Sequence, residues 1–244
     1  MHRWLVLALC GCGRLDFEPR ADGATLDVAV VAVDAPPSDL IAWYRLDETG
    51  GTVFVDAIAG NNGSCANPSC PAPATGHFGG GMLFDAVDDC IVVTDLGQLH
   101  VPQFTISAWV FRNADDAGSV ISKQFGAAQL NSWQLEMFVP NVLSLTSDHN
   151  DAGSQLHTPD NTLQPGRWQY FAATYDGLTE IIYVDGVQAI TIANAQPISY
   201  DNRPLYIGCD FNTSFTAVLN GRLDDIRVYN RPLDPTELAK LASM

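Results

Sequence analysis

The segment EIIYVDGVQAITI, residues 180–192, decides the fold class. Two runs rich in β-branched residues flank Asp185-Gly186, a dipeptide that is typical of a tight turn between two antiparallel strands. Similar alternating segments recur at residues 105–111 (TISAWVF) and 168–175 (WQYFAATY), whereas helical periodicity is nearly absent. Roughly a dozen such strands without an internal repeat predict an all-β fold, a single antiparallel two-sheet sandwich.

One short helix is expected near the C-terminal end of the sequence. Asp234, Pro235 and Glu237 have the spacing of the N-cap, N1 and N3 positions of a capping box. In this motif the two acidic side chains accept hydrogen bonds from backbone N–H groups that the first helical turn leaves unpaired. The motif predicts a helix over residues 235–241.

The segment GRLDDIRVY, residues 221–229, has the alternation of a strand. Period two places Asp224 on the same face as Ile226 and Val228, which are expected to lie in the core. A buried carboxylate without a partner is costly. Asp224 therefore needs a cation, an arginine or backbone N–H groups beside it.

The overall charge limits the classes of partner. The chain has 244 residues, of which 28 are acidic and 12 are basic, so its formal net charge is −16. Such a charge argues against nucleic acid, which proteins bind mainly by neutralising phosphates. It also argues against electrostatic binding to an anionic membrane.

The N-terminal segment MHRWLVLALCGC is expected to be a processing signal rather than part of the fold. It resembles a bacterial lipoprotein signal, residues 1–12, in which LCGC fits the Leu-x-Gly-Cys box and Cys12 is the lipidation site. An ordinary signal peptide and a misassigned start codon are the alternatives. Residues 13–39 are rich in Asp, Ala, Pro and Gly and are predicted to be a flexible tether before a domain at 40–244. This organisation predicts an exported protein of the bacterial cell envelope, at the outer membrane or cell surface, that contacts the membrane only through its lipid anchor.

Four cysteines remain once the two of the signal segment are set aside. An even number in an exported protein predicts two disulfides, and four cysteines allow three pairings. Cys65 and Cys70 share one loop and are the first candidate pair, which leaves Cys90 with Cys209. A zinc site built from all four thiolates is the competing interpretation.

Several blocks of sequence together resemble one family. They are AWYRLDETGGTVFVDAIAGNNGS (residues 42–64), GGGMLFDAVDDCIVV (79–93), FTISAWVF (104–111), GRWQYFAATYDG followed by IIYVDGVQ, and PLYIGCD followed by LNGRLDDIRVYNRPLDPTEL. In this order they resemble the laminin-G-like, concanavalin A-like jelly-roll domains over about residues 40–242. Ala86 departs from the family pattern, where a glycine is common, and so do the cysteines.

The resemblance implies an exported module that binds carbohydrate or an extracellular protein and does not catalyse a reaction. It also implies a structural Ca²⁺ between the opening loop and the last strand. Calcium takes about six to eight oxygen ligands. On this basis Asp56, Asn61 and Asp224 are the expected calcium ligands, and Ca²⁺ is the expected cofactor.

Two further places are candidates for ligand binding. Trp133, whose strand starts just after a loop, is the first candidate for a platform on which a sugar ring stacks. Asp148, Asn150 and Asp151 lie in the acidic segment SDHNDAG, which is expected to form a rim loop that holds a second, ligand-bridging calcium. A solvated turn is the competing interpretation of that segment.

Catalysis is not expected. Glycoside hydrolases need two carboxyl groups on either side of the scissile bond, and the related hydrolases carry them in a Glu-x-Asp-x-x-Glu strand. No glutamate of the sequence begins such a motif, and Glu136 stands alone on its predicted strand. The sequence therefore predicts a carbohydrate-binding module, with a protein-binding, adhesive or structural envelope domain as the alternative and a glycoside hydrolase disfavoured.

Overall fold

The computed structural model describes residues 37–95, 97–126, 130–149, 152–211 and 216–244. The predicted signal segment, the lipidation site Cys12, nearly all of the predicted tether at 13–39, and the candidates Asn150 and Asp151 lie outside these residues. Among the described helices none is long and apolar enough to span a membrane.

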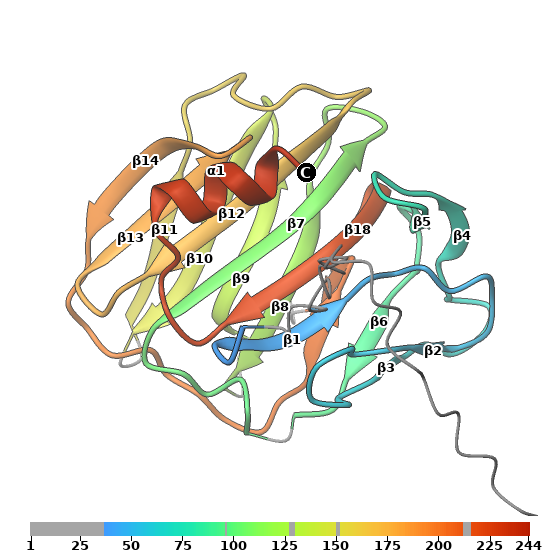
Figure 1. The fold of residues 1–244 in the computed structure, drawn as a ribbon, viewed down its shortest axis with the longest axis horizontal. Coiled ribbons are helices and arrows are strands. Elements are labelled where there is room, and N and C mark those ends of the chain that lie inside the picture. The colour runs from blue at the N-terminus through green and yellow to red at the C-terminus, as the bar shows by residue number, and fades with distance from the viewer. Residues whose placement is uncertain (1–36, 96, 127–129, 150–151, 212–215) are drawn as a thin grey trace, which may run out of the picture. The chain divides into compact units, whose positions relative to one another are not determined.

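Eight strands form the first sheet, called sheet A. Seven of them follow the order β14-β13-β12-β7-β18-β5-β4, and β1 pairs with β18 off this path (Figure 1). The strands are β1 (Leu40–Tyr44), β4 (Ala72–Thr75), β5 (Gly80–Asp85), β7 (Phe104–Arg112), β12 (Trp168–Tyr175), β13 (Thr179–Val184), β14 (Val187–Ala193) and β18 (Asn220–Tyr229).

Eight more strands form sheet B, in the order β11-β10-β9-β8-β15-β6-β3-β2, and a separate two-stranded ribbon pairs β16 with β17. The strands of sheet B are β2 (Val53–Phe54), β3 (Gly63–Ser64), β6 (Ile91–Val93), β8 (Gly118–Phe125), β9 (Leu130–Phe138), β10 (Val142–His149), β11 (Ala152–His157) and β15 (Leu205–Ile207), and those of the ribbon are β16 (Cys209–Phe211) and β17 (Thr216–Val218). Neighbouring strands pair antiparallel throughout. The prediction of an antiparallel two-sheet sandwich is confirmed.

The main core lies between the two sheets. Phe104 and Ile106 of β7, Trp133 of β9 and Phe171 of β12 are fully buried there. A second, smaller cluster lies on the outer face of sheet A, where Trp109 and Tyr170 pack with Leu238 of the C-terminal helix α1 (Pro235–Ala242). Figure 1 shows α1 lying across this face of the sheet.

The predicted hairpin and helix are both confirmed. Asp185 and Gly186 have positive φ angles of 52° and 76°, as a two-residue turn with two left-handed positions requires. The Asp234 side chain accepts from the backbone N–H groups of Thr236 and Glu237, and the Glu237 side chain accepts from the N–H of Asp234. The capping box thus fixes the start of α1.

Strand β18 contains a bulge that reverses one expectation. Leu223, Ile226 and Val228 are all completely buried in the core. In a regular strand side chains alternate between the two faces, so Leu223 would lie on the face opposite to Ile226 and Val228. Pairing with β7 shifts register between Asp224 and Arg227, and Asp225 has φ +52°. The prediction that Asp224 shares a face with Ile226 and Val228 was therefore wrong, because the extra residue of the bulge leaves Asp224 on the outer face, opposite Trp109.

Both predicted disulfides are present. Cys65 pairs with Cys70 within one loop, and Cys90 pairs with Cys209, which lies 119 residues later in the sequence. The second bond fastens the ribbon strand β16 beside β6. Because all four sulfur atoms are used, the zinc interpretation is excluded.

Candidate functional site

The outer face of sheet B is polar at its centre. In β9 the side chains of Trp133, Leu135 and Met137 point into the core, so the intervening Ser132, Gln134 and Glu136 point the other way. The strands β8 and β10 on either side continue the pattern. Residues directly opposite each other in an antiparallel pair share a face, which gives two rows across the three strands, Ser119–Glu136–Ser144 and Ser122–Gln134–Thr146.

We call these six residues, together with Gln124, Asn131 and Ser132, the polar face. Every member carries a hydroxyl, amide or carboxyl group. Gln134 and Glu136 are only 3% and 6% exposed, whereas Thr146 is half-buried and its neighbour in β11, Gln155, is exposed. The polar face is thus most accessible on the side of β11.

Asp210 of the ribbon strand β16 anchors one side of the polar face. Its carboxylate accepts hydrogen bonds from Ser122 Oγ at 3.1 Å, Gln124 Nε2 at 3.3 Å and Asn131 Nδ2 at 3.3 Å. The preceding residue is Cys209 of the long-range disulfide, so a covalent bond fixes the backbone beside Asp210.

Not all polar atoms of this face are satisfied within the protein. Gln134 Nε2 donates to Ser119 Oγ at 3.2 Å, and Asn131 Nδ2 donates to Gln134 Oε1 at 2.7 Å. By contrast, Asn131 Oδ1, Ser132 Oγ and Ser144 Oγ are buried and have no hydrogen-bond partner among the described residues. An unsatisfied buried oxygen costs about 1–3 kcal/mol, so these three atoms are a local cost to the fold.

Glu136 is the carboxyl group at the centre of the polar face. Burial raises its pKa to about 7, and the nearby charge of Asp210 acts in the same direction. Thr146 Oγ1 donates to Glu136 Oε1 at 2.7 Å, which acts against the shift. Near neutral pH Glu136 therefore exists in both forms, so it can donate or accept a hydrogen bond.

Asp56, a predicted calcium ligand, has a different role. Its Oδ1 accepts from the backbone N–H groups of Trp43 and Ile58, and its Oδ2 accepts from those of Ala59 and Asn61, at 2.9 to 3.2 Å. Two donors on each oxygen occupy the lone pairs that a cation would use. Asp56 is an anchor that holds the opening loop against β1, and its assignment as a calcium ligand stays a prediction.

Asn61 and Asp224, the other two predicted calcium ligands, have hydrogen-bond partners of their own. Asn61 donates from its side chain to Gln98, and its backbone carbonyl accepts from the Tyr44 hydroxyl at 2.8 Å. Asp224 Oδ2 accepts from the backbone N–H of Phe78 at 2.7 Å, and burial raises the pKa of Asp224 to about 6. The backbone partner, one of the alternatives for Asp224, is the one present.

Asn61 Oδ1 is buried and has no hydrogen-bond partner among the described residues, so the three proposed calcium ligands stay a prediction. Within the part of the chain that the structure describes, one group of three carboxylates lies close enough together to hold a metal, Asp85, Asp88 and Asp89. None of the three proposed calcium ligands belongs to this group. Calcium binding by the domain stays a prediction.

Trp133 is not a sugar platform. Its side chain has no exposed surface and packs in the core with its ring centroid 5.8 Å from that of Phe104. The prediction was wrong because alternation shows that a strand has two faces without showing which of them is turned inward.

Asp148 lies in strand β10 rather than in a rim loop, and it is 1% exposed. Its backbone carbonyl accepts from the N–H of Ser199 at 2.9 Å. The interpretation of this position as a solvated turn is likewise wrong. Asn150 and Asp151 are outside the described residues.

The polar face was not predicted, although its signal is visible in the sequence. LNSWQLEMF and VLSLTSD both alternate polar with apolar residues. What the sequence could not show is the register that brings Glu136 between Ser119 and Ser144, or the return of the chain that places Asp210 beside Ser122.

Comparisons with known proteins agree with this architecture. A family model described as Concanavalin A-like lectin/glucanases superfamily (Laminin_G_3) matches residues 85–239. A search of curated proteins finds no match.

Solved structures of the same fold include binding domains. Domain 4 of AbnA, a GH43 extracellular arabinanase from Geobacillus stearothermophilus, solved in complex with arabinotriose, is 18% identical with a TM-score of 0.67, over 84% of this chain and 98% of that one. The binding domain of Paraclostridial Mosquitocidal Protein 1 is 15% identical with a TM-score of 0.65, over 84% of this chain and 52% of that one. The binding domain of botulinum neurotoxin DC, solved with rat synaptotagmin II, is 14% identical with a TM-score of 0.62, over 84% of this chain and 51% of that one.

This chain spans about half the length of the two toxin domains, and identities this low show a shared fold alone. The family model, by contrast, covers more than half of the chain in one continuous match. The chain belongs to the concanavalin A-like lectin/glucanases superfamily.

Proposed function

We propose that this protein is a non-catalytic module that binds carbohydrate on the polar face of sheet B. The observation that carries the proposal is the pair of rows across β8, β9 and β10, in which every side chain has a hydrogen-bonding group and which reach the surface at Thr146, beside the exposed Gln155 of β11.

Membership of a lectin-containing superfamily supports the same proposal. The structure of the AbnA domain in complex with arabinotriose also supports it, because the match covers 98% of that domain's chain. The complex of a botulinum binding domain with synaptotagmin favours the second candidate, binding of an extracellular protein.

The test is binding of the purified protein to a broad glycan panel, followed by calorimetric titration of the best ligand. Gln134→Ala removes an amide from the centre of the polar face, and Gln188→Ala removes a matched amide from the exposed strand β14. We expect Gln134→Ala to weaken binding at least about tenfold, which corresponds to one lost hydrogen bond of about 1.4 kcal/mol, and Gln188→Ala to have no effect.

Two outcomes would count against the proposal. A folded protein that binds no glycan on the panel would move the function to the protein-binding candidate. Sugar binding that Gln134→Ala leaves unchanged would show that the polar face is not the site.

Export and lipid attachment at Cys12 form part of the same proposal. They are supported by the signal-like residues 1–12 and by the two disulfides, which persist in oxidising compartments. Mass spectrometry of the N-terminal peptide from membranes of the producing bacterium tests this directly: a diacylglyceryl group on Cys12 is expected, and an unmodified N-terminus beginning elsewhere would refute it.

A further inference from the structure

Strand β14 forms a free edge of sheet A (Figure 1). It ends the order of the sheet, so β13 is its one strand neighbour among the described residues. The outer side of such a strand presents unpaired backbone N–H and C=O groups to which another strand can add, and soluble proteins usually blunt it with charges, prolines or a short length. β14 has seven residues and contains no charged residue and no proline.

The other sheet edges are less suited to pairing. Strand β4, at the opposite end of sheet A, has four residues and includes Pro73, which has no N–H group to donate. Strand β2, at one end of sheet B, has two residues. Strand β11, at the other end of sheet B, exposes the polar side chains of Gln155 and His157. Length and apolar surface therefore occur together at β14.

Apolar side chains are exposed along this edge. Val187 and Ile192 of β14 are both exposed, and so is Leu178 in the turn beside the end of the strand. Ile190, which lies between the first two, is half-buried and packs against the main core. A partner strand that covers this row would extend the core and remove apolar surface from water.

The hydrogen bonds of the hairpin show which backbone groups are free. In an antiparallel pair alternate residues bond to the neighbouring strand, and the residues between them point their N–H and C=O groups away from it. Asn194 donates to the carbonyl of Leu178 at 2.7 Å, so Asn194 bonds toward β13. Ile192, two residues earlier, bonds in the same direction. Thr191 and Ala193 therefore point their backbone groups outward, toward the free edge.

The regular part of the edge is symmetric about Ile192. Ala189 has no partner where the pairing with β13 shifts register, so regular pairing begins at Ile190 and continues to Asn194. Ile192 is the middle residue of this segment. A twofold axis at Ile192 would place Thr191 of one copy opposite residue 193 of a second copy, and these two residues could then exchange backbone hydrogen bonds.

Charge favours a second copy of this chain as the occupant of the edge. Residues 187–200 contain no Asp, Glu, Lys or Arg, although the chain has a formal net charge of −16. Across the twofold axis residue 187 lies opposite residue 197, so uncharged residues face uncharged residues along the whole paired length. A charged strand of another protein would find no complementary charge there. Most other surfaces of so acidic a chain would repel their own copy.

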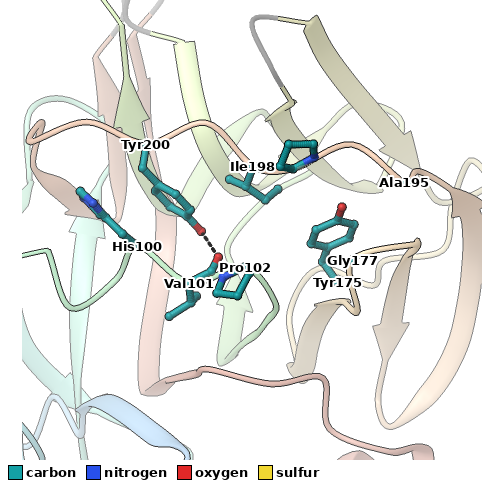
Figure 2. A pocket seen from close by; sticks show the side chains of 9 residues that line it. His100, Val101, Pro102, Tyr175, Gly177, Ala195, Ile198 and Tyr200 are labelled. Carbon is teal, nitrogen blue, oxygen red and sulfur yellow. Dashed lines mark hydrogen bonds between the residues drawn. The ribbon is translucent and has the colours of Figure 1, made fainter.

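The chain beyond β14 is held in place, so the edge is formed before a partner arrives. Figure 2 shows Tyr175 and Tyr200 on opposite sides of a pocket of about 430 Å³ that this segment lines. The Tyr175 hydroxyl donates to the carbonyl of Gln196 at 2.5 Å, and the Tyr200 hydroxyl donates to that of Val101 at 2.9 Å. A strand fixed in this way loses little conformational freedom on pairing.

We propose that the protein forms a symmetric dimer in which the β14 edges of two copies pair antiparallel across a twofold axis at Ile192. The pairing joins the two copies of sheet A into one continuous sheet. Ile192 lies opposite Glu180, whose carboxylate accepts from Ser147 of sheet B, so the two Ile192 side chains meet on the side of sheet B.

The dimer has a consequence for the polar face. Because the axis is perpendicular to the shared sheet, both polar faces point the same way, and the dimer presents two of them to one partner. The inference goes beyond the proposed function and does not depend on what the polar face binds, so the two can fail separately.

The experiment is analytical ultracentrifugation of the purified full chain over a wide range of concentrations. The wild type is expected to sediment as a dimer that dissociates on dilution. Ile192→Lys places two cations directly opposite each other at the axis and should raise the dissociation constant at least about tenfold. Val87→Lys introduces the same charge at an exposed apolar residue between β5 and β6 and should leave the dissociation constant unchanged.

Cysteine variants test the register of the pairing. Ile192→Cys brings two thiols to the axis, so mild oxidation should join two chains into a covalent dimer beyond any that the native cysteines give in the wild type. Val187→Cys lies on the same strand and is also exposed, but it faces residue 197 and should not cross-link. This pair of variants serves as the test if Ile192→Lys does not fold.

Three results would overturn the inference. They are a protein that stays monomeric at every concentration, a dimer whose dissociation constant Ile192→Lys leaves unchanged, and cross-linking through Val187→Cys but not through Ile192→Cys. A monomer whose β14 amides become protected from hydrogen exchange when an alternating Thr-Val peptide is added would assign the edge to a strand of another protein.

Discussion

The indole N–H of Trp43 donates a 2.6 Å hydrogen bond to the carboxylate of Asp225, a residue 182 positions later in the chain. The contact joins β1 to the bulge of β18, where Asp225 holds a left-handed backbone. Arg227 Nε donates to the same carboxylate oxygen at 3.1 Å and its guanidinium lies over the Trp43 ring. A left-handed backbone costs roughly 1–2 kcal/mol for a residue other than glycine, and these contacts offset that cost.

The Trp43–Asp225 bond is expected to stabilise the fold by a measurable amount. Trp43→Phe keeps an aromatic ring and leaves the carboxylate short of one donor, so we expect a loss of about 1–2 kcal/mol in the free energy of unfolding by urea. Trp168→Phe, at another half-buried tryptophan of sheet A, is the matched control. If Trp43→Phe and Asp225→Ala prove additive in a double-mutant cycle, the bond contributes nothing.

Glu136 is expected to make the stability depend on pH. The pKa of Glu136 is raised from 4.5 to about 7 in the folded protein. The contribution of the protonated side chain to the free energy of unfolding is therefore fully present below about pH 4.5 and is lost as the pH rises through 7. Glu136→Gln, which cannot ionise, should therefore gain stability relative to the wild type between pH 5 and pH 8. The expected gain between pH 5 and pH 8 is about 2.5 kcal/mol.

Urea denaturation at several pH values measures the Glu136 effect. Asp160→Asn, at an exposed carboxylate after β11, provides the control for removing one negative charge. A difference between Glu136→Gln and the wild type that stays constant from pH 5 to pH 8 would contradict the assigned role of burial.

The two disulfides should contribute unequally. Loop-closure entropy grows with the length of the enclosed loop, and the Cys90–Cys209 bond encloses 119 positions whereas the Cys65–Cys70 bond encloses 5. Replacing the first pair by alanines should lower the free energy of unfolding by about 5 kcal/mol, and replacing the second by about 2 kcal/mol. Similar losses for the two double variants would mean that loop length does not govern their contribution.

The role of Asp56 can be separated from that of calcium. Because four backbone N–H groups depend on its carboxylate, Asp56→Ala should destabilise the protein by about 3 kcal/mol or more. We expect the loss caused by Asp56→Ala to be the same in calcium and in excess chelator, because its carboxylate bonds to backbone N–H groups in both conditions. A chelator that lowers the wild-type melting temperature but leaves Asp56→Ala unaffected would instead show that Asp56 is a metal ligand.

The sequence predicted those features that short stretches of chain determine. The Asp185-Gly186 turn and the capping box at Asp234 depend on a few neighbouring residues, and the disulfides follow from a small even number of cysteines. The bulge at Asp225 could not be predicted, because one inserted residue changes every later face assignment while leaving the alternation itself intact.

The candidate sites depend on register and topology, and for that reason were mostly missed. Glu136 looked isolated along its own strand, but its neighbours Ser119 and Ser144 come from β8 and β10. The free edge of β14 likewise depends on which strand ends the sheet, which no local pattern shows. Trp133 was placed on the wrong face because both faces of its strand are compatible with a tryptophan.

The central position of β18 has a consequence for how the chain folds. This late strand lies between β7 and β5 and also receives β1, so sheet A is interrupted until β18 is in place. Before that moment β5 and β7 expose unpaired edges, on which strands of other chains can add. Folding that depends on such distant pairings is expected to take milliseconds to seconds. The chain is therefore expected to aggregate most readily in the interval before β18 pairs with β5 and β7.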